Sequence, residues 1–209
     1  DISTREVKKV LAAAGDLSGV TIDAYETDGV KLIKFHLGVT TLTLNVNVLE
    51  SEMGGTVAWS ISKTDVLGDA DYRAEDFVNS GLFGGWSVGD KRDGTIGKLS
   101  DTVGTHYGAI AEWLLFTPLI RLETLSVDEL SIETITGFSP EGDCTIAISA
   151  TDRGLIYSDE FWQFYGEDNV YGQRFIAYQL GYVRDWIGFK FRGASKSRVN
   201  LAFLNIEAS

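Results

Sequence analysis

The chain has 209 residues, a formal net charge of −12 and a single cysteine, Cys144. So negative a charge argues against nucleic-acid binding by the chain as a whole, and one cysteine excludes an intrachain disulfide. No stretch reaches the roughly 18 consecutive apolar residues of a membrane helix and we find no signal peptide, so no membrane partner is expected.

The first predicted element is a helix over residues 4–14. Ser3-Thr4-Arg5-Glu6 has the spacing of a capping box, in which the Ser3 hydroxyl accepts from the amide of Glu6. Apolar residues then recur at helical spacing up to Gly15, whose backbone freedom suits a helix end. We predict no second long helix.

After Gly15 the apolar residues recur at every second position, which is typical of β-strands. Alternating runs at 20–24 and 33–37 flank Thr27-Asp28-Gly29, which predicts a hairpin. Further strands are predicted at 42–48 and 57–61. Four antiparallel strands of this size make one propeller blade or half of a sandwich.

Residues 63–76 form an acidic stretch that raises the question of a calcium site. The regular acidic spacing and the closing glutamate of a twelve-residue calcium loop are absent. We therefore expect a solvated connection and no bound metal. The acids in question are Asp65, Asp69, Asp71, Glu75 and Asp76.

The middle of the chain predicts more short strands. Hairpins are expected across residues 79–81 and 90–94, and Pro118 indicates an edge strand or a break within 111–120. Residues 122–135 are typical of one or two strands, and Cys144 opens a further apolar run as a small core side chain.

Residues 157–169 are aromatic and acidic, with Phe161, Trp162, Phe164 and Tyr165 close together. This cluster is either a surface that binds sugar or protein, or core beneath a long loop. We favour core.

The last segment, residues 171–209, alternates polar positions with apolar ones, among them Leu201 and Phe203, and carries six Lys and Arg against two acids. An acidic body with a basic, aromatic, strand-forming tail favours an interface to a partner, because Arg and Trp are enriched at interface hot spots. The alternative is an ordinary edge-strand pair whose charges prevent aggregation. The candidate partner-binding residues are Arg184, Trp186, Arg192, Lys196 and Arg198.

No catalytic motif is present. The two histidines, His36 and His106, lie 70 residues apart without a zinc or nucleophile-elbow motif, and no pair of acids is singled out by spacing. We expect no catalytic residues, no cofactor and no enzyme activity; a β-propeller glycosidase has only the abundance of acids in its favour.

Several segments together resemble one known family. They are ISTREVKKVL at 2–11, DFV at 76–78, VGDKRDGTIGKL at 88–99, LLFTPL at 114–119, LSIETITG at 130–137, ISATDRGLIY at 148–157 and YGQRFIAYQLGYVRDWIGFKFRG at 171–193. In this order and spacing they resemble the C-terminal half of the packaged-DNA stabilisation proteins, the tail accessory or hub proteins of short-tailed phages. The chain departs from many relatives at Tyr178-Gln179, where they have two arginines, so a charge contact there is not carried over.

The resemblance implies an all-β fold of propeller-like antiparallel sheets with one N-terminal helix, which we treat as a single β domain over residues 1–209. It implies a virion structural protein that is assembled in the host cytoplasm. This protein forms a ring in the tail, hexameric by the resemblance, beside a portal-proximal tail factor and the tail needle. There it helps to close the channel on packaged DNA, touching DNA only indirectly. The chain opens with Asp1 rather than Met and the family proteins are about twice as long, which suggests a fragment. The alternative is a carbohydrate- or receptor-binding β domain of a phage tail.

Overall fold

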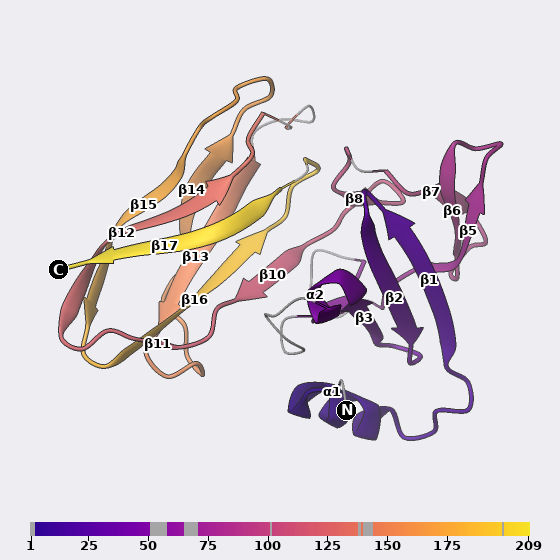
Figure 1. The fold of residues 1–209 in the computed structure, drawn as a ribbon, viewed down its shortest axis with the longest axis horizontal. Helices are drawn as coiled ribbons and strands as arrows, with labels where there is room; N and C mark the ends of the chain where they lie inside the picture. Colours follow the sequence, from indigo (N-terminus) through magenta and orange to yellow (C-terminus); the bar gives the residue numbers. More distant parts are fainter. Residues whose placement is uncertain are drawn as a thin grey trace. The chain divides into compact units, whose positions relative to one another are not determined.

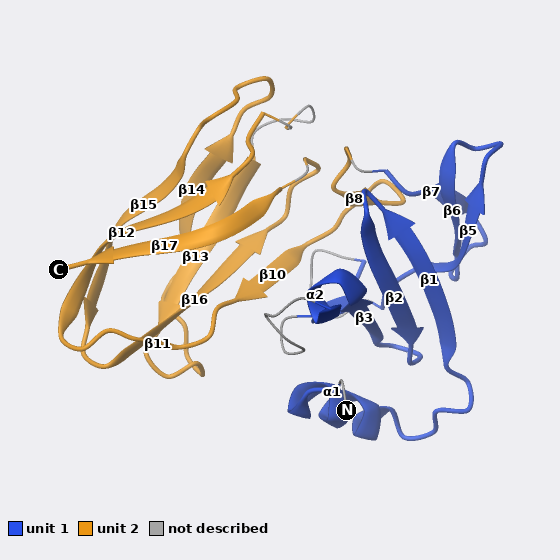
Figure 2. Ribbon diagram, in the orientation of Figure 1, with its two compact units in different colours: residues 1–100 blue, residues 101–209 orange. Residues whose placement is uncertain are grey.

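The structure, a computed structural model, describes residues 3–50, 58–64, 71–100, 102–137, 139, 144–197 and 199–209. The chain divides into two compact units, Asp1–Ser100 and Asp101–Ser209, where the sequence analysis treats residues 1–209 as one domain (Figure 2). Strands pair antiparallel in both units, so the predicted antiparallel β class is confirmed. In the described part of the chain, no helix has both the length and the apolar character needed to cross a membrane.

Unit 1 begins with the predicted helix, α1 (Arg5–Ala14). Its N-cap is Thr4 rather than Ser3, because the Thr4 hydroxyl accepts a hydrogen bond from Val7 N at 3.2 Å. The Glu6 carboxylate accepts from the ammonium group of Lys9 at 2.9 Å.

A four-stranded antiparallel sheet follows, with its strands in sequence order (Figure 1). Asp28 and Gly29 both have positive φ, 50° and 76°, as a two-residue hairpin turn requires, so the predicted hairpin is confirmed. The strands are β1 (Thr21–Thr27), β2 (Val30–His36), β3 (Thr41–Asn45) and β4 (Trp59–Ser62).

The strand predicted at 42–48 is wrong in its second half. β3 ends at Asn45 and the chain enters a short second helix, α2 (Val46–Glu50). The side-chain oxygen of Asn45 accepts from Val48 N at 3.2 Å, which favours a helical turn over a continued strand. The expectation of one helix is corrected accordingly, and Val57 of the next predicted strand lies outside the described residues.

The rest of unit 1 is a three-stranded sheet of β5 (Ala74–Ser80), β6 (Gly85–Asp90) and β7 (Ile96–Lys98). Both predicted hairpins are therefore confirmed. Asp65 and Asp69 of the acidic stretch lie outside the described residues. Asp71 pairs with the ammonium group of Lys91 at 2.7 Å, which accounts for its carboxylate without a metal.

Unit 2 is a sandwich of two antiparallel sheets (Figure 1). One sheet has the order β10-β16-β13-β14, with β11 also paired to β16, and the other has the order β15-β12-β17. A hairpin of β8 (Thr105–His106) and β9 (Ala109–Ile110) precedes them. The strands are β10 (Trp113–Phe116), β11 (Ile120–Arg121), β12 (Leu125–Thr134), β13 (Cys144–Thr151), β14 (Phe161–Gly166), β15 (Phe175–Val183), β16 (Trp186–Gly193) and β17 (Leu201–Ala208).

The core of unit 2 lies between these sheets and follows the predicted alternation. Phe175, Phe189 and Phe191 are all at most 1% exposed, and Cys144 is fully buried among them as predicted. Burial raises the pKa of the Cys144 thiol. The aromatic run at 157–169 divides: Tyr165 is core, whereas Trp162 remains 49% exposed.

Two details of the C-terminal segment differ from the predictions. β16 is not an edge strand, because it pairs with β13 on one side and with β10 and β11 on the other. Phe203 leaves the apolar face that the alternation assigned to it and is 67% exposed. The pairing of β12 with β17 shifts between Glu133 and Thr134, and an irregularity of one residue reverses the face of every side chain beyond it.

Candidate functional site

The predicted partner-binding residues do not form one cluster. Arg184 lies in the turn between β15 and β16, and exposed Trp186 begins β16, with the Arg121 guanidinium 5.9 Å from its ring centre. Exposed Lys196 follows the opposite end of β16. Arg198 lies outside the described residues.

Arg192 is occupied within its own chain. Its Nη1 donates to Glu112 at 3.0 Å, its Nε donates to Glu160 at 2.9 Å, and its guanidinium lies 5.0 Å from the centre of the Trp162 ring. These hydrogen bonds, first among them that to Glu160, raise the pKa of Arg192 and lower the pKa of Glu160. Lys190 adds an ion pair to Glu160 at 3.3 Å.

These charges lie among exposed apolar side chains on the outer surface of the five-stranded sheet. Arg192 pairs in register with Leu114 and with Ala147, and Ala147 pairs with Trp162, so the four residues form one row across the strands. We call this surface the five-stranded face. Its exposed large apolar residues, each 45–54% exposed, are Leu114, Phe116, Trp162 and Trp186.

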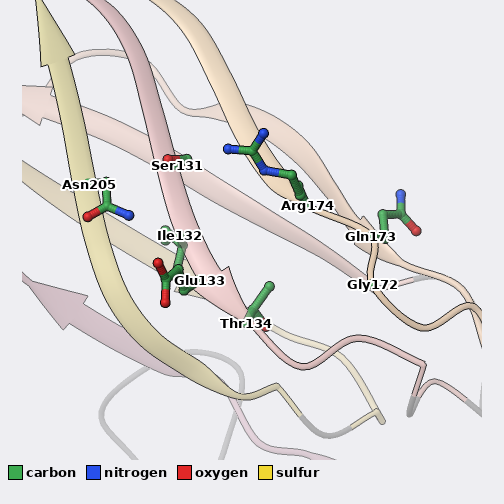
Figure 3. A pocket seen from close by; sticks show the side chains of 8 residues that line it. All are labelled: Ser131, Ile132, Glu133, Thr134, Gly172, Gln173, Arg174 and Asn205. Atoms are coloured by element: carbon green, nitrogen blue, oxygen red, sulfur yellow. The ribbon is translucent and has the colours of Figure 1, made fainter.

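The other sheet carries a hollow of about 310 Å³ on its outer surface (Figure 3). Figure 3 shows the Arg174 guanidinium reaching from the residue just before β15 toward Ser131 on β12, with Asn205 on β17 at the other side of β12. The lining residues come from two strands, β12 and β17, and from the segment just before β15: Ser131, Ile132, Glu133, Thr134, Gly172, Gln173, Arg174 and Asn205.

The loop that carries Gly172 and Gln173 is fixed by one buried hydroxyl. Thr136 Oγ1 donates to Val170 O at 3.0 Å and accepts from Gln173 N at 3.1 Å. Thr136 is 1% exposed, so this double hydrogen bond is shielded from water. Gly172 has φ 81°, a conformation that permits the turn into β15.

The end of β12 is fixed by a second buried group, the hydroxyl of Tyr165. It bonds to Thr134 Oγ1 at 2.5 Å and donates to Asn200 O at 3.0 Å, joining β12, β14 and the segment before β17. The end of β12, the segment before β15 and the segment before β17 are therefore held by hydrogen bonds beneath the hollow.

Most polar side chains of the hollow have no partner in the protein. Among the residues that the structure describes, Ser131, Glu133, Gln173 and Asn205 make no side-chain hydrogen bond. Arg174 is 73% exposed on its side chain and approaches Glu129 only to 3.9 Å. Donors and acceptors thus face one space and remain available to a ligand.

A larger hollow of about 480 Å³ lies at the turn after β13. Its lining residues all lie between Ala150 and Ser158 and include the exposed Leu155 and Ile156. Because the end of β13 and the turn after it supply the whole lining, side chains from distant elements do not converge there.

Unit 1 holds a buried polar cluster. The Asp23 carboxylate accepts from Asp76 N at 3.2 Å and lies 3.0 Å from His36 Nε2, while Thr41 Oγ1 lies 3.2 Å from His36 Nδ1. A carboxylate can only accept, so Nε2 carries the proton and the Thr41 hydroxyl donates to Nδ1. Burial, opposed by Asp23, lowers the pKa of His36 and keeps it neutral.

This acid–histidine–hydroxyl line has the connections of a nucleophile triad, but no substrate can reach it. Thr41 is fully buried and His36 is 6% exposed. The line joins β1, β2, β3 and β5 and is structural in this arrangement.

Lys34 completes the cluster. Its ammonium group donates to Thr43 Oγ1 at 3.1 Å and to Ser62 Oγ at 2.8 Å. Burial lowers its pKa to about 8, an effect that the Asp23 charge partly offsets.

In the described ranges, no three His, Cys, Asp or Glu residues gather as a metal site would require. The absence of metal, cofactor and catalysis remains a prediction.

Sequence reasoning missed the hollow and the buried cluster. Ser131 and Glu133 alternate with Leu130 and Ile132, so their shared outward face could have been read from the sequence. Their neighbour Asn205 could not, because the pairing of β12 with β17 joins positions about 70 residues apart. Lys34 and His36 also alternate with apolar residues, but here the polar face is the buried one.

Comparison with known proteins divides the chain where the structure does. Residues 1–104 match the family model described as "Bacteriophage P22 Gp10, beta-propeller", and residues 112–209 match "Bacteriophage P22 Gp10, beta-sandwich". The chain is 29% identical over 203 residues to the "Tail hub protein gp10" of Salmonella phage P22. This alignment covers 96% of the chain and 41% of that relative.

Proposed function

Because the chain belongs to the P22 Gp10 family, we propose that it is a non-enzymatic structural part of a phage tail hub, located in the virion tail. The observation that carries this proposal is the succession of the propeller match, which ends at residue 104, and the sandwich match, which begins at residue 112, just after the boundary between the two units at residues 100 and 101. The chain spans 41% of the length of this relative, so a function of the whole hub is a proposal for this chain.

The finer proposal is that the hub assembles in the host cytoplasm below the portal and helps to close the channel, so that packaged DNA is retained. It is supported by the ordered segments that resemble the packaged-DNA stabilisation proteins, and the same resemblance supplies a portal-proximal tail factor and a tail needle as partners. Contact with DNA is indirect, because the chain carries −12 and three of the six basic residues of its tail, Arg174, Lys190 and Arg192, already lie within ion-pair distance of its own acids.

We assign the contact with a second copy of this chain to the five-stranded face. Four large apolar side chains, each close to half exposed, lie there around a paired charge cluster, which is the composition of an interface centre. A stable contact needs about 800 Å² per partner. Exposed Arg184 lies at the end of this face and would meet acidic surface on the next copy, which offsets the repulsion between chains of net charge −12.

The test is the double substitution Arg184→Glu with Trp186→Ala, made in the hub protein of the phage that encodes it. Neither side chain is buried, so the melting temperature of the isolated chain is expected to stay within about 2 °C of wild type. Light scattering of the hub protein is expected to show loss of the ring, and electron microscopy is expected to show heads without complete tails.

The matched control is Lys31→Glu, at an exposed position of β2 in unit 1, outside the five-stranded sheet. It is expected to leave assembly intact. Rings of normal mass in the double variant would contradict the assignment of this face. Filled heads that keep nuclease-resistant DNA when the hub is missing would contradict the role in DNA retention.

A further inference from the structure

The hollow on the outer surface of the β15-β12-β17 sheet is not used by the proposed hub contact, which lies on the other sheet. We propose that this hollow binds a neutral pyranoside, as a contact of the virion with surface saccharide. The argument rests on the hydrogen-bonding capacity, the charge and the aromatic neighbours of the hollow. It holds whether or not the chain forms a hub ring.

The hydrogen-bonding capacity suits a ligand rich in hydroxyl groups. Glu133 can only accept and Arg174 can only donate, while Ser131, Gln173 and Asn205 can do both. A sugar hydroxyl both donates and accepts, so one ring can satisfy this mixed set. In the part of the chain that the structure describes, Ser131, Glu133, Gln173 and Asn205 make no side-chain hydrogen bond within the protein. Arg174 approaches an acid, Glu129, only to 3.9 Å.

The charge of the surface excludes an anionic ligand. Glu129, Glu133 and Glu207 lie on the outer face of β12 and β17, with Arg174 as the nearby cation. A phosphate, a nucleic acid or an acidic saccharide would meet more negative than positive charge there. A neutral ligand avoids this repulsion and can still form hydrogen bonds with the carboxylates and with the Arg174 guanidinium.

Aromatic rings flank the polar groups. Phe203 pairs in register with Glu133 and is 67% exposed, and Tyr178 pairs with Glu129 and is 60% exposed. Aromatic side chains with a few convergent polar groups are what a small-molecule site needs, and the C–H face of a pyranose packs well on such rings. The register shift in β12 and β17 that turns Phe203 outward is what places this ring beside the hollow.

The site is held ready before any ligand arrives. The double hydrogen bond of Thr136 fixes the loop of Gln173, and the Tyr165 hydroxyl fixes the end of β12. A pre-formed site loses little conformational entropy on binding. Weak affinity per site is sufficient, because several copies in one virion would bind a surface together.

The experiment is an NMR titration of the ¹⁵N-labelled chain with maltotetraose, cellotetraose, mannotetraose and lacto-N-tetraose, and with trigalacturonic acid as an anionic probe. We expect at least one neutral saccharide to bind with a Kd of about 1 mM or tighter and to shift the amides of residues 131–133, 172–174 and 203–205. The anionic probe is expected to bind at least tenfold more weakly. Phe203→Ser and Arg174→Gln are each expected to weaken binding about tenfold.

The matched control is Phe116→Ser, which removes an exposed ring from the five-stranded face and is expected to leave saccharide binding unchanged. The proposal is overturned if none of the four neutral saccharides shifts these amides at about 10 mM, or if Phe203→Ser binds as the wild type does. It is also overturned if Phe203→Ser abolishes a contact with another tail protein while no saccharide binds, because the face would then belong to a protein partner. Loss of the ring in the Arg184 and Trp186 variant leaves this titration unaffected, so the two proposals fail separately.

Discussion

The ammonium group of Lys34 lies 4.1 Å from the centre of the Tyr72 ring, inside unit 1. Lys34 is 3% exposed and Tyr72 is 6% exposed, so the cation is held by an aromatic face and two hydroxyls in place of water. Such a charge costs free energy that an apolar side chain of similar length would not.

Replacing Lys34 with Met is therefore expected to leave the protein at least as stable at pH 7. Thr43 and Ser62 remain satisfied, because their hydroxyls also bond to each other at 2.7 Å. Thermal unfolding at pH 7 checks the expectation, and a fall of more than about 1 kcal/mol in the free energy of unfolding would contradict it. Lys31→Met, at an exposed position of the same strand, is the control.

Lys34→Met is also expected to remove a part of the pH dependence of the free energy of unfolding. The pKa of Lys34 falls from 10.5 to about 8 on folding, so between these values the unfolded chain binds more protons and stability rises with pH. The full rise is about 3 kcal/mol at most. Tyr25 acts oppositely above pH 10, because burial raises its pKa to about 12, so the quantity to measure is the difference between wild type and Lys34→Met from pH 7 to 10. Equal slopes of the free energy of unfolding against pH in the two proteins would contradict the lowered pKa of Lys34.

Acid is expected to destabilise unit 1 through His36. Burial lowers the pKa of His36 below 6.5, so the folded state resists the proton that the unfolded state takes up. The stability that neutral His36 contributes is complete above pH 6.5 and is lost as the pH falls through the lowered value. His36→Gln keeps a donor and an acceptor for Asp23 and Thr41 but does not titrate, so its melting temperature is expected to fall less between pH 7.5 and about 5.5. His106→Gln is the control. If the melting temperature of that variant also falls less than that of wild type in acid, the loss of stability is not specific to His36.

Arg192→Met is expected to destabilise unit 2 by about 2 kcal/mol, because Glu112 and Glu160 lose a partner in a partly buried site. Arg153→Met, where the side chain is 82% exposed, is expected to change stability by less than about 0.5 kcal/mol. Adding Glu160→Gln to Arg192→Met should recover part of the loss, with a coupling of about 1 kcal/mol in urea unfolding. Strict additivity of the two substitutions would show that the pair does not interact.

Gly193→Ala is expected to cost about 1–3 kcal/mol, because the Trp113 indole lies across Gly193 and a methyl group there would overlap the ring. Gly19→Ala is the matched control: its new methyl group meets no atom within 4 Å. Near-UV circular dichroism reports the displacement of Trp113 directly. An unchanged spectrum and stability in Gly193→Ala would place the indole elsewhere.

The sequence predicts those features of the fold that depend only on the local spacing of apolar residues and on turn residues. The alternation at 187–191 was sufficient to bury Ile187, Phe189 and Phe191, and the Asp28-Gly29 turn was sufficient to pair β1 with β2. Those elements are local, so local propensity and hydrophobic pattern agree with the fold.

It does not predict what depends on pairing between distant strands. Arg192 looked like a free cation because its acids, Glu112 and Glu160, are 80 and 32 residues away. Phe203 looked like core because the register shift opposite Glu133 leaves no mark in the apolar spacing. The hollow is built from β12, β17 and the segment before β15, which only the finished sheet brings together. The alternation of Ser131 and Glu133 shows that they share a face, but it does not show the hollow that they help to line.

The place of β16 in its sheet has a consequence for how the molecule is made. In unit 1 the strands pair in the order in which they are synthesised, β1 to β4, so each can join a partner already present. In unit 2 the central strand, β16, is synthesised after most of its sheet. β10 and β13 do not pair with each other and belong to one sheet only once β16 has inserted between them. Long-range pairing of this kind folds slowly, on the millisecond-to-second scale, and leaves open strand edges meanwhile. Unit 1 is therefore expected to fold on the ribosome well before unit 2. The apolar strands of unit 2 remain unpaired and prone to aggregation until residues 186–193 have been synthesised and released.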